Sequence, residues 1–150
     1  LSLAMPDATQ KLTFDVAASR VDEHGGIATC KSASIRLDTD LAGNADTFNP
    51  AELLLGALAA CMIKGIERVH PILAFQLRGV EVHVHGVRQD VPPRMEQISY
   101  EIVVDSDESD ARLALLHENV KKYGTVFNTV KPGTSRQGVL RRAAHDGGAP

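Results

Sequence analysis

The residue of this 150-residue chain with the clearest capacity for chemistry is Cys61, which lies inside an apolar run from Leu53 to Ile63. A cysteine thiolate is a strong nucleophile that can be oxidised reversibly to a sulfenic acid. A free cysteine among apolar residues is also often a packed core side chain that behaves as a small hydrophobe. The sequence leaves both interpretations open, an inert core thiol and a shielded nucleophile.

A second cysteine and two histidines are the other candidates. Cys30 can pair with Cys61 only if their Cα atoms come within about 7 Å, and the spacing in the sequence does not decide this. His83 and His85 share one strand face with Glu81, but a zinc site needs a further ligand, and no CxxC or HExxH motif is present. We therefore expect a solvated strand face and no metal.

Motifs for a bound cofactor are missing from the sequence. The chain contains neither a glycine-rich phosphate loop nor a GxSxG nucleophile motif. Nothing in its pattern supports a nucleotide, flavin or pyridoxal phosphate. We expect no cofactor.

The segment that must position the thiol has the signals of a long helix up to Val69. Asn49 is a preferred N-cap, Pro50 suits the first helical position, and Glu52 can reach back to the Asn49 backbone N–H. The apolar run that follows covers the whole circumference, so we expect the helix to be central and enclosed. This run is shorter than the roughly 18–20 residues that cross a bilayer.

Strand patterns flank this helix on both sides. Alternating apolar and polar residues or turn signals predict strands over residues 11–17, 27–30, 34–37, 76–87, 95–104 and 135–141. A second helix is expected over 109–123, with Gly124 as its C-terminal stop. The order βββ-α-ββ-α-β predicts an α+β fold with antiparallel sheets around two central helices.

Composition restricts the classes of partner. The net charge is −3 and the basic residues are scattered, which argues against binding to nucleic acid or to an anionic membrane. The first ten residues have no basic region ahead of an apolar core, and two cysteines do not make a disulfide framework, so we expect a cytoplasmic protein. The length fits one domain over 1–150, with 1–10 and 143–150 as flexible tails.

The helix motif NPAELLLGALAACMI is similar to the signature of the OsmC/Ohr family of thiol-dependent hydroperoxide reductases, in which NP, an acidic residue and a leucine precede A-A/G-C. The expected order of elements also resembles that family, from about Lys11 to Arg141. The resemblance implies an OsmC-like fold and an intertwined homodimer with the apolar helices at its centre.

The resemblance also assigns roles to single residues. It makes Cys61 the thiolate that attacks the O–O bond of a hydroperoxide and becomes a sulfenic acid. A second family cysteine, which condenses with the sulfenic acid, falls on Gly124. With a glycine at this position, the resemblance implies a one-cysteine peroxidase that needs an external thiol reductant.

Two further roles follow in the same way. The arginine that stabilises the family thiolate matches Arg20, and the glutamate that holds this arginine is represented by Glu52. In the family this glutamate lies ten residues before the cysteine, a position that Ala51 occupies in this chain. Glu52 is one residue later, and its place in the N-terminal cap of the helix also accounts for it.

The implied partners are an organic hydroperoxide and a thiol. The alternative is a non-catalytic dimer of the same fold that binds a small hydrophobic ligand.

Overall fold

The computed structural model describes residues 11–145. The chain divides into two units, Leu1–Ala51 and Glu52–Pro150, which are described separately. The predicted tail 1–10 and most of the predicted tail 143–150 lie outside the described residues; residues 143–145 have no regular secondary structure.

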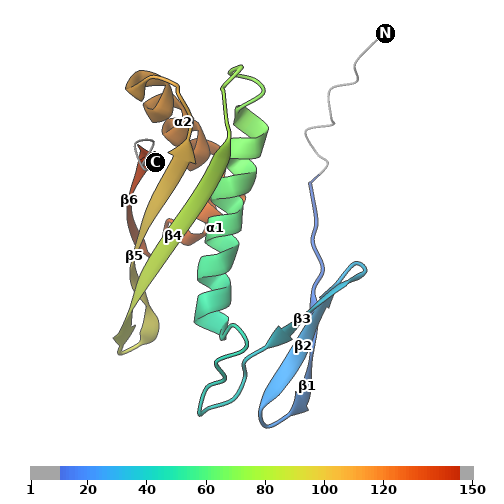
Figure 1. Cartoon of the computed structure of the whole chain (residues 1–150). Coiled ribbons are helices and arrows are strands. Elements are labelled where there is room, and N and C mark those ends of the chain that lie inside the picture. Colours follow the sequence, from blue (N-terminus) through green and yellow to red (C-terminus); the bar gives the residue numbers. More distant parts are fainter. Residues whose placement is uncertain (1–10, 146–150) are drawn as a thin grey trace. The chain divides into compact units, whose positions relative to one another are not determined.

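The N-terminal unit is a three-stranded antiparallel meander of β1 (Ala17–Asp22), β2 (Gly25–Cys30) and β3 (Ala33–Leu37) (Figure 1). The first strand begins at Ala17, whereas the alternation predicted it over 11–17. Pairing starts at Ala17 with Thr29, and β2 ends one residue later, so residues 11–16 have no strand beside them. Their apolar side chains are consequently exposed.

A buried carboxylate organises the loop that leads to the long helix. Asp38 is 6% exposed and accepts hydrogen bonds from the backbone N–H groups of Asp40 and Asn44. An isolated parallel bridge joins Leu37 to Phe48. The following helix, α1 (Pro50–Val69), begins directly after Asn49, as the capping signals predict.

The C-terminal unit contains a sheet of strand order β4-β5-β6. The strands β4 (Gly79–Asp90) and β5 (Pro93–Asp105) form the predicted antiparallel hairpin. The last strand, β6 (Ser135–Arg142), pairs parallel to β5, which corrects the expectation of purely antiparallel sheets. A parallel partner requires a crossover connection, and the chain between β5 and β6 supplies one through its helices.

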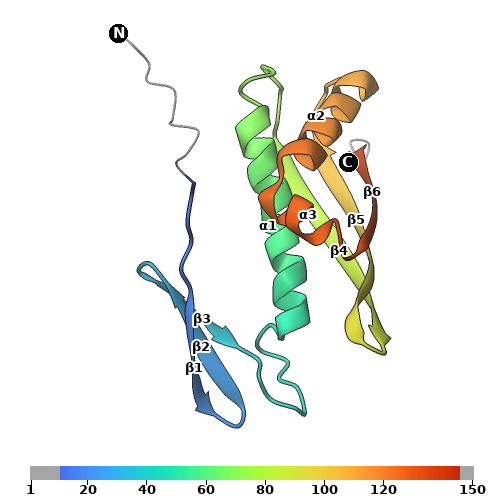
Figure 2. The same ribbon diagram turned by 180° about the vertical axis from the view of Figure 1, so that it is seen from behind.

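Two helices form this crossover (Figure 2). The first, α2 (Asp110–Tyr123), is capped by Ser109, whose side chain accepts from the Arg112 N–H. Gly124 ends it as predicted, but the chain then enters a short helix, α3 (Thr125–Val130), that the sequence did not predict. Gly124 has φ −76° and ψ 117°, an extended conformation, so the chain turns once and resumes helical geometry.

The helices cover one face of the β4-β5-β6 sheet (Figures 1 and 2). Fully buried side chains from α1, β5 and α2 make the core, among them Leu58, Met62, Ile66, Ile98, Ile102, Val104 and Leu116. Within one chain α1 is not covered all the way round: Leu54 is 40% and Ile63, on the opposite side of the helix, is 38% exposed. The expectation of an enclosed helix therefore fails for the single chain. None of the described helices has the length and hydropathy of a membrane span.

Candidate functional site

The thiol of Cys61 lies in the middle of α1, half-buried and packed against the core of the C-terminal unit. The turn between α2 and α3 lies close to the sulfur. A Cβ atom added to Gly124 would lie 3.1 Å from the Cys61 Sγ. The α2–α3 turn therefore covers one side of the sulfur.

This distance has a specific chemical meaning. In a disulfide, the S–S bond of about 2.04 Å places the Cβ of one cysteine about 3.0 Å from the Sγ of its partner. Gly124 is thus at disulfide distance from the thiol, although it carries no side chain. Gly124 is also the position to which the resemblance assigns the second cysteine.

A side chain at Gly124 would be crowded, whereas the backbone conformation there suits any residue. Besides the sulfur, the added Cβ would meet the Phe127 Cβ at 3.1 Å and the Val120 carbonyl oxygen at 3.3 Å. A Cβ added to Gly65 of α1 would meet Val120 at 3.7 Å, an ordinary contact, so a methyl group would fit there. The absence of a side chain at Gly124 lets the α2–α3 turn approach α1 closely.

The surroundings of the thiol on α1 are apolar, as expected, but they divide into two kinds. Leu58 and Met62 are 0% and 1% exposed and belong to the core. Leu54, two turns before Cys61 on the same side of the helix, is 40% exposed. A ligand could thus reach the Leu54 side of the helix, whereas Leu58 and Met62 are enclosed in the core.

The other predicted site residues are dispersed. Arg20 is exposed on β1 and lines a cleft of about 330 Å³ together with Asp22 and Glu23, all in the N-terminal unit. Cys30 ends β2 in the same unit and, like Cys61, is a free thiol. Cys61 belongs to the C-terminal unit.

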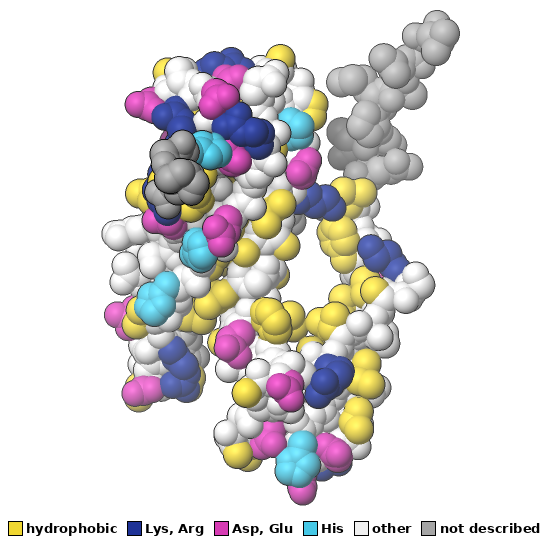
Figure 3. Space-filling view, viewed as in Figure 1, with side chains coloured by type: hydrophobic (Ala, Val, Ile, Leu, Met, Phe, Trp, Pro, Cys, Tyr) yellow, Lys and Arg dark blue, Asp and Glu magenta, His cyan; other side chains and the backbone are white. Residues whose placement is uncertain are grey.

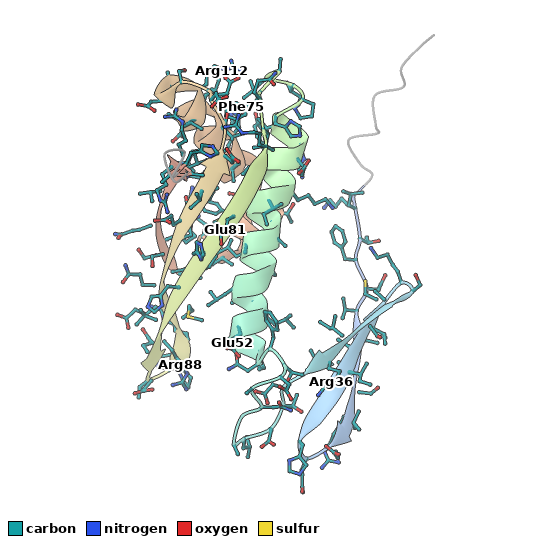
Figure 4. All side chains as sticks on the ribbon, viewed as in Figure 1. Arg36, Glu52, Phe75, Glu81, Arg88 and Arg112 are labelled. Atoms are coloured by element: carbon teal, nitrogen blue, oxygen red, sulfur yellow. The ribbon has the colours of Figure 1, made fainter. Side chains whose placement is uncertain are left out.

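Glu52 is exposed in the first turn of α1, at the foot of the helix in Figure 4. It precedes Cys61 by nine residues, which corresponds to roughly 13 Å along a helix axis at 1.5 Å per residue. Direct contact between this carboxylate and the sulfur is therefore excluded. Glu52 can act on the thiol only through another side chain.

The two histidines behave as a solvated strand face. His83 and His85 are exposed on β4, and His83 lies 3.4 Å from the Glu81 carboxylate. Figure 3 shows histidine and acidic side chains along this strand, and Figure 4 labels Glu81 there. Among residues 11–145 no group of three or more potential ligands could hold a metal ion.

Sequence reasoning missed an aromatic group beside the thiol segment. The Tyr100 hydroxyl and the His117 Nε2 share a 2.8 Å hydrogen bond, and the Tyr100 ring meets Phe127 edge-on at 6.2 Å. Burial raises the pKa of Tyr100; it lowers the pKa of His117, which nearby Lys121 lowers further. The pair is therefore neutral at pH 7. Tyr100 alternates with apolar neighbours on β5, a pattern that marks it only as core.

An α+β fold with a half-buried cysteine in a long apolar helix defines a class of small thiol proteins. Residues 43–136, more than half of the chain, match the family model described as OsmC-like protein. The chain belongs to this family. No curated protein sequence matches the chain.

Solved structures agree on the fold. An OsmC-like protein from Mycoplasma pneumoniae is 19% identical with a TM-score of 0.83, over 90% of this chain and 100% of that one. An organic hydroperoxide resistance protein OsmC from Legionella pneumophila is 15% identical, with a TM-score of 0.69 over 89% and 100%. The organic hydroperoxide resistance protein OhrB of Bacillus subtilis is 17% identical, with a TM-score of 0.58 over 86% and 98%. At these identities the likeness establishes the fold alone.

Proposed function

We propose that the protein reduces organic hydroperoxides through Cys61, with an external thiol as reductant. The thiolate attacks the terminal oxygen of the hydroperoxide and breaks the O–O bond, so that Cys61 becomes a sulfenic acid and the leaving alkoxide takes a proton to form the alcohol. One external thiol then forms a mixed disulfide and releases water. A second thiol frees Cys61 and leaves as the disulfide of the reductant.

The observation that carries this proposal is the position of Gly124 beside Cys61. A half-buried thiol lies on the family helix, and the chain position at disulfide distance from it carries no sulfur. The sulfenic acid then has no partner at this position and requires a reductant from solution. A reducing compartment such as the cytoplasm supplies such thiols.

Arg20 and Glu52 are proposed as positioning residues. A thiolate is stabilised by a nearby cation, and an exposed arginine such as Arg20 can supply one. Glu52, which cannot reach the sulfur itself, would hold the arginine. Their substitution, Arg20→Gln or Glu52→Gln, is then expected to slow peroxide consumption without removing the thiol.

The activity is tested by consumption of t-butyl hydroperoxide with dithiothreitol present, comparing the unmodified chain with Cys61→Ser and Cys30→Ser. Loss of turnover in Cys61→Ser alone is the expected result for a one-cysteine cycle. Loss in both variants would make Cys30 a resolving thiol. Rates equal to the blank in all three proteins would refute the peroxidase proposal for this substrate.

Gly124 also favours a second candidate, a non-catalytic dimer that binds a small hydrophobic ligand beside α1. The exposed apolar side of the helix, including Leu54, offers a surface for such a ligand. Cys61→Ala distinguishes the two functions, because it abolishes peroxide reduction but leaves the affinity for an apolar ligand intact. The test uses binding of a fluorescent fatty acid to both proteins.

A further inference from the structure

A cleft between α2, α3 and β6 is lined by cations. Four basic side chains contribute to it, Lys121, Lys122, Lys131 and Arg136, against a single carboxylate, Glu118. Its volume of about 740 Å³ lies within the range of small-molecule sites. We call it the basic cleft; its elements can be followed in Figure 2.

The charge of this cleft is opposite to that of the whole protein. The chain carries −3, whereas four cations and one carboxylate give the cleft +3. Glu118 pairs with Lys121 at 2.6 Å, and this contact keeps the pKa of the carboxyl group low, so the carboxylate is already compensated. The remaining cations make a local positive potential in a concave, partly desolvated surface, which attracts anions.

Aromatic side chains supply the apolar wall. The Arg136 guanidinium lies 4.2 Å from the centre of the Phe127 ring, and its Nη1 donates a 3.5 Å hydrogen bond to the Phe127 carbonyl oxygen. The buried Nε–H of Arg136 has no acceptor among the described residues. Tyr100 lies so close to Gly138 that a Cβ there would be 2.3 Å from its ring.

We propose that the basic cleft binds a small organic anion with two or more negative charges, either carboxylates or phosphates. Several cations on three elements can contact separate anionic groups, and the aromatic wall accommodates a carbon frame. A nucleic acid is disfavoured, because the cations are confined to one cleft of an acidic protein and do not form a continuous stripe. The proposal is independent of the peroxidase activity.

The test is isothermal titration calorimetry of the full chain with citrate and, separately, with inorganic pyrophosphate at low salt. The variant Lys122→Gln/Lys131→Gln removes two exposed charges and should preserve the fold, which a thermal melt checks. Arg88→Gln is the matched control, since Arg88 lies at the far end of β4 (Figure 4). Cys61→Ser is a second control that separates this site from the thiol.

We expect one anion to bind per chain, with affinity about tenfold weaker in the double lysine variant. Both controls should bind as the unmodified chain does. Binding of citrate alone identifies a carboxylate site, and binding of pyrophosphate alone identifies a phosphate site. No saturable heat with either anion, or equal affinities in the lysine variant and the Arg88 control, would overturn the proposal.

Discussion

At the scale of single residues, the relation between Cys61 and Gly124 makes a direct prediction. In Gly124→Cys, the new sulfur starts from a Cβ 3.1 Å from the Cys61 Sγ, and a disulfide should form on exposure to air. Closing the intervening loop stabilises the fold by up to about 4 kcal/mol in the chain-entropy model, less any strain from Phe127. Titration with a thiol reagent should find one reactive thiol, Cys30, after denaturation without reductant.

The matched control is Gly124→Ser, which adds almost the same atoms without the sulfur. Crowding by Phe127 and by the Val120 carbonyl should destabilise it by about 1–3 kcal/mol, and both native thiols should titrate. Three free thiols in denatured Gly124→Cys would show that the turn does not lie against Cys61 in solution.

At the scale of secondary structure, substitutions of two adjacent leucines on α2 can measure how much core packing of this helix contributes to the free energy of unfolding. Leu116 is 0% exposed and Leu115 is 43% exposed. Leu116→Ala leaves a cavity under the sheet and should lower the free energy of unfolding by about 2–5 kcal/mol. Leu115→Ala should cost under about 1 kcal/mol, because most of its surface is already in water. Urea denaturation followed by circular dichroism compares the two; equal losses would contradict this packing.

The same elements show which features the sequence predicts. Capping and periodicity placed α1 and α2 correctly, because Asn49-Pro50 and Ser109 start them with local chemistry. The six residues of α3 are too few to display a period, so this helix was missed. The start of β1 was misplaced because alternation over 11–16 records side-chain type and not the presence of a partner strand.

The candidate site was predictable only in part for a related reason. A motif identifies Cys61, since a helix keeps its neighbours in sequence near it in space. The approach of Gly124 joins positions that are far apart along the chain and depends on how α2 packs on α1. The basic cleft likewise combines α2, α3 and β6, and its cations look scattered in the sequence.

At the scale of the whole molecule, the exposed apolar surface predicts a second copy of the chain. Leu54 and Ile63 of α1 are 40% and 38% exposed, and Figure 3 shows hydrophobic side chains along the N-terminal strands, where Val21 is 61% and Ile35 is 48% exposed. Burying this apolar surface at an interface lowers the free energy of the protein. The homodimer implied by the family resemblance would cover it.

Leu54→Glu tests this prediction, because a carboxylate at this exposed apolar position cannot be buried at an interface without a partner charge. We expect the unmodified chain to elute as a dimer at micromolar concentration in size exclusion with light scattering, and Leu54→Glu as a monomer with its secondary structure retained. The matched control is Val87→Glu, since Val87 on β4 is also 40% exposed and should leave the dimer intact. A monomeric unmodified chain would contradict the dimer, and a Leu54→Glu variant that still dimerises as tightly would show that Leu54 lies outside the interface.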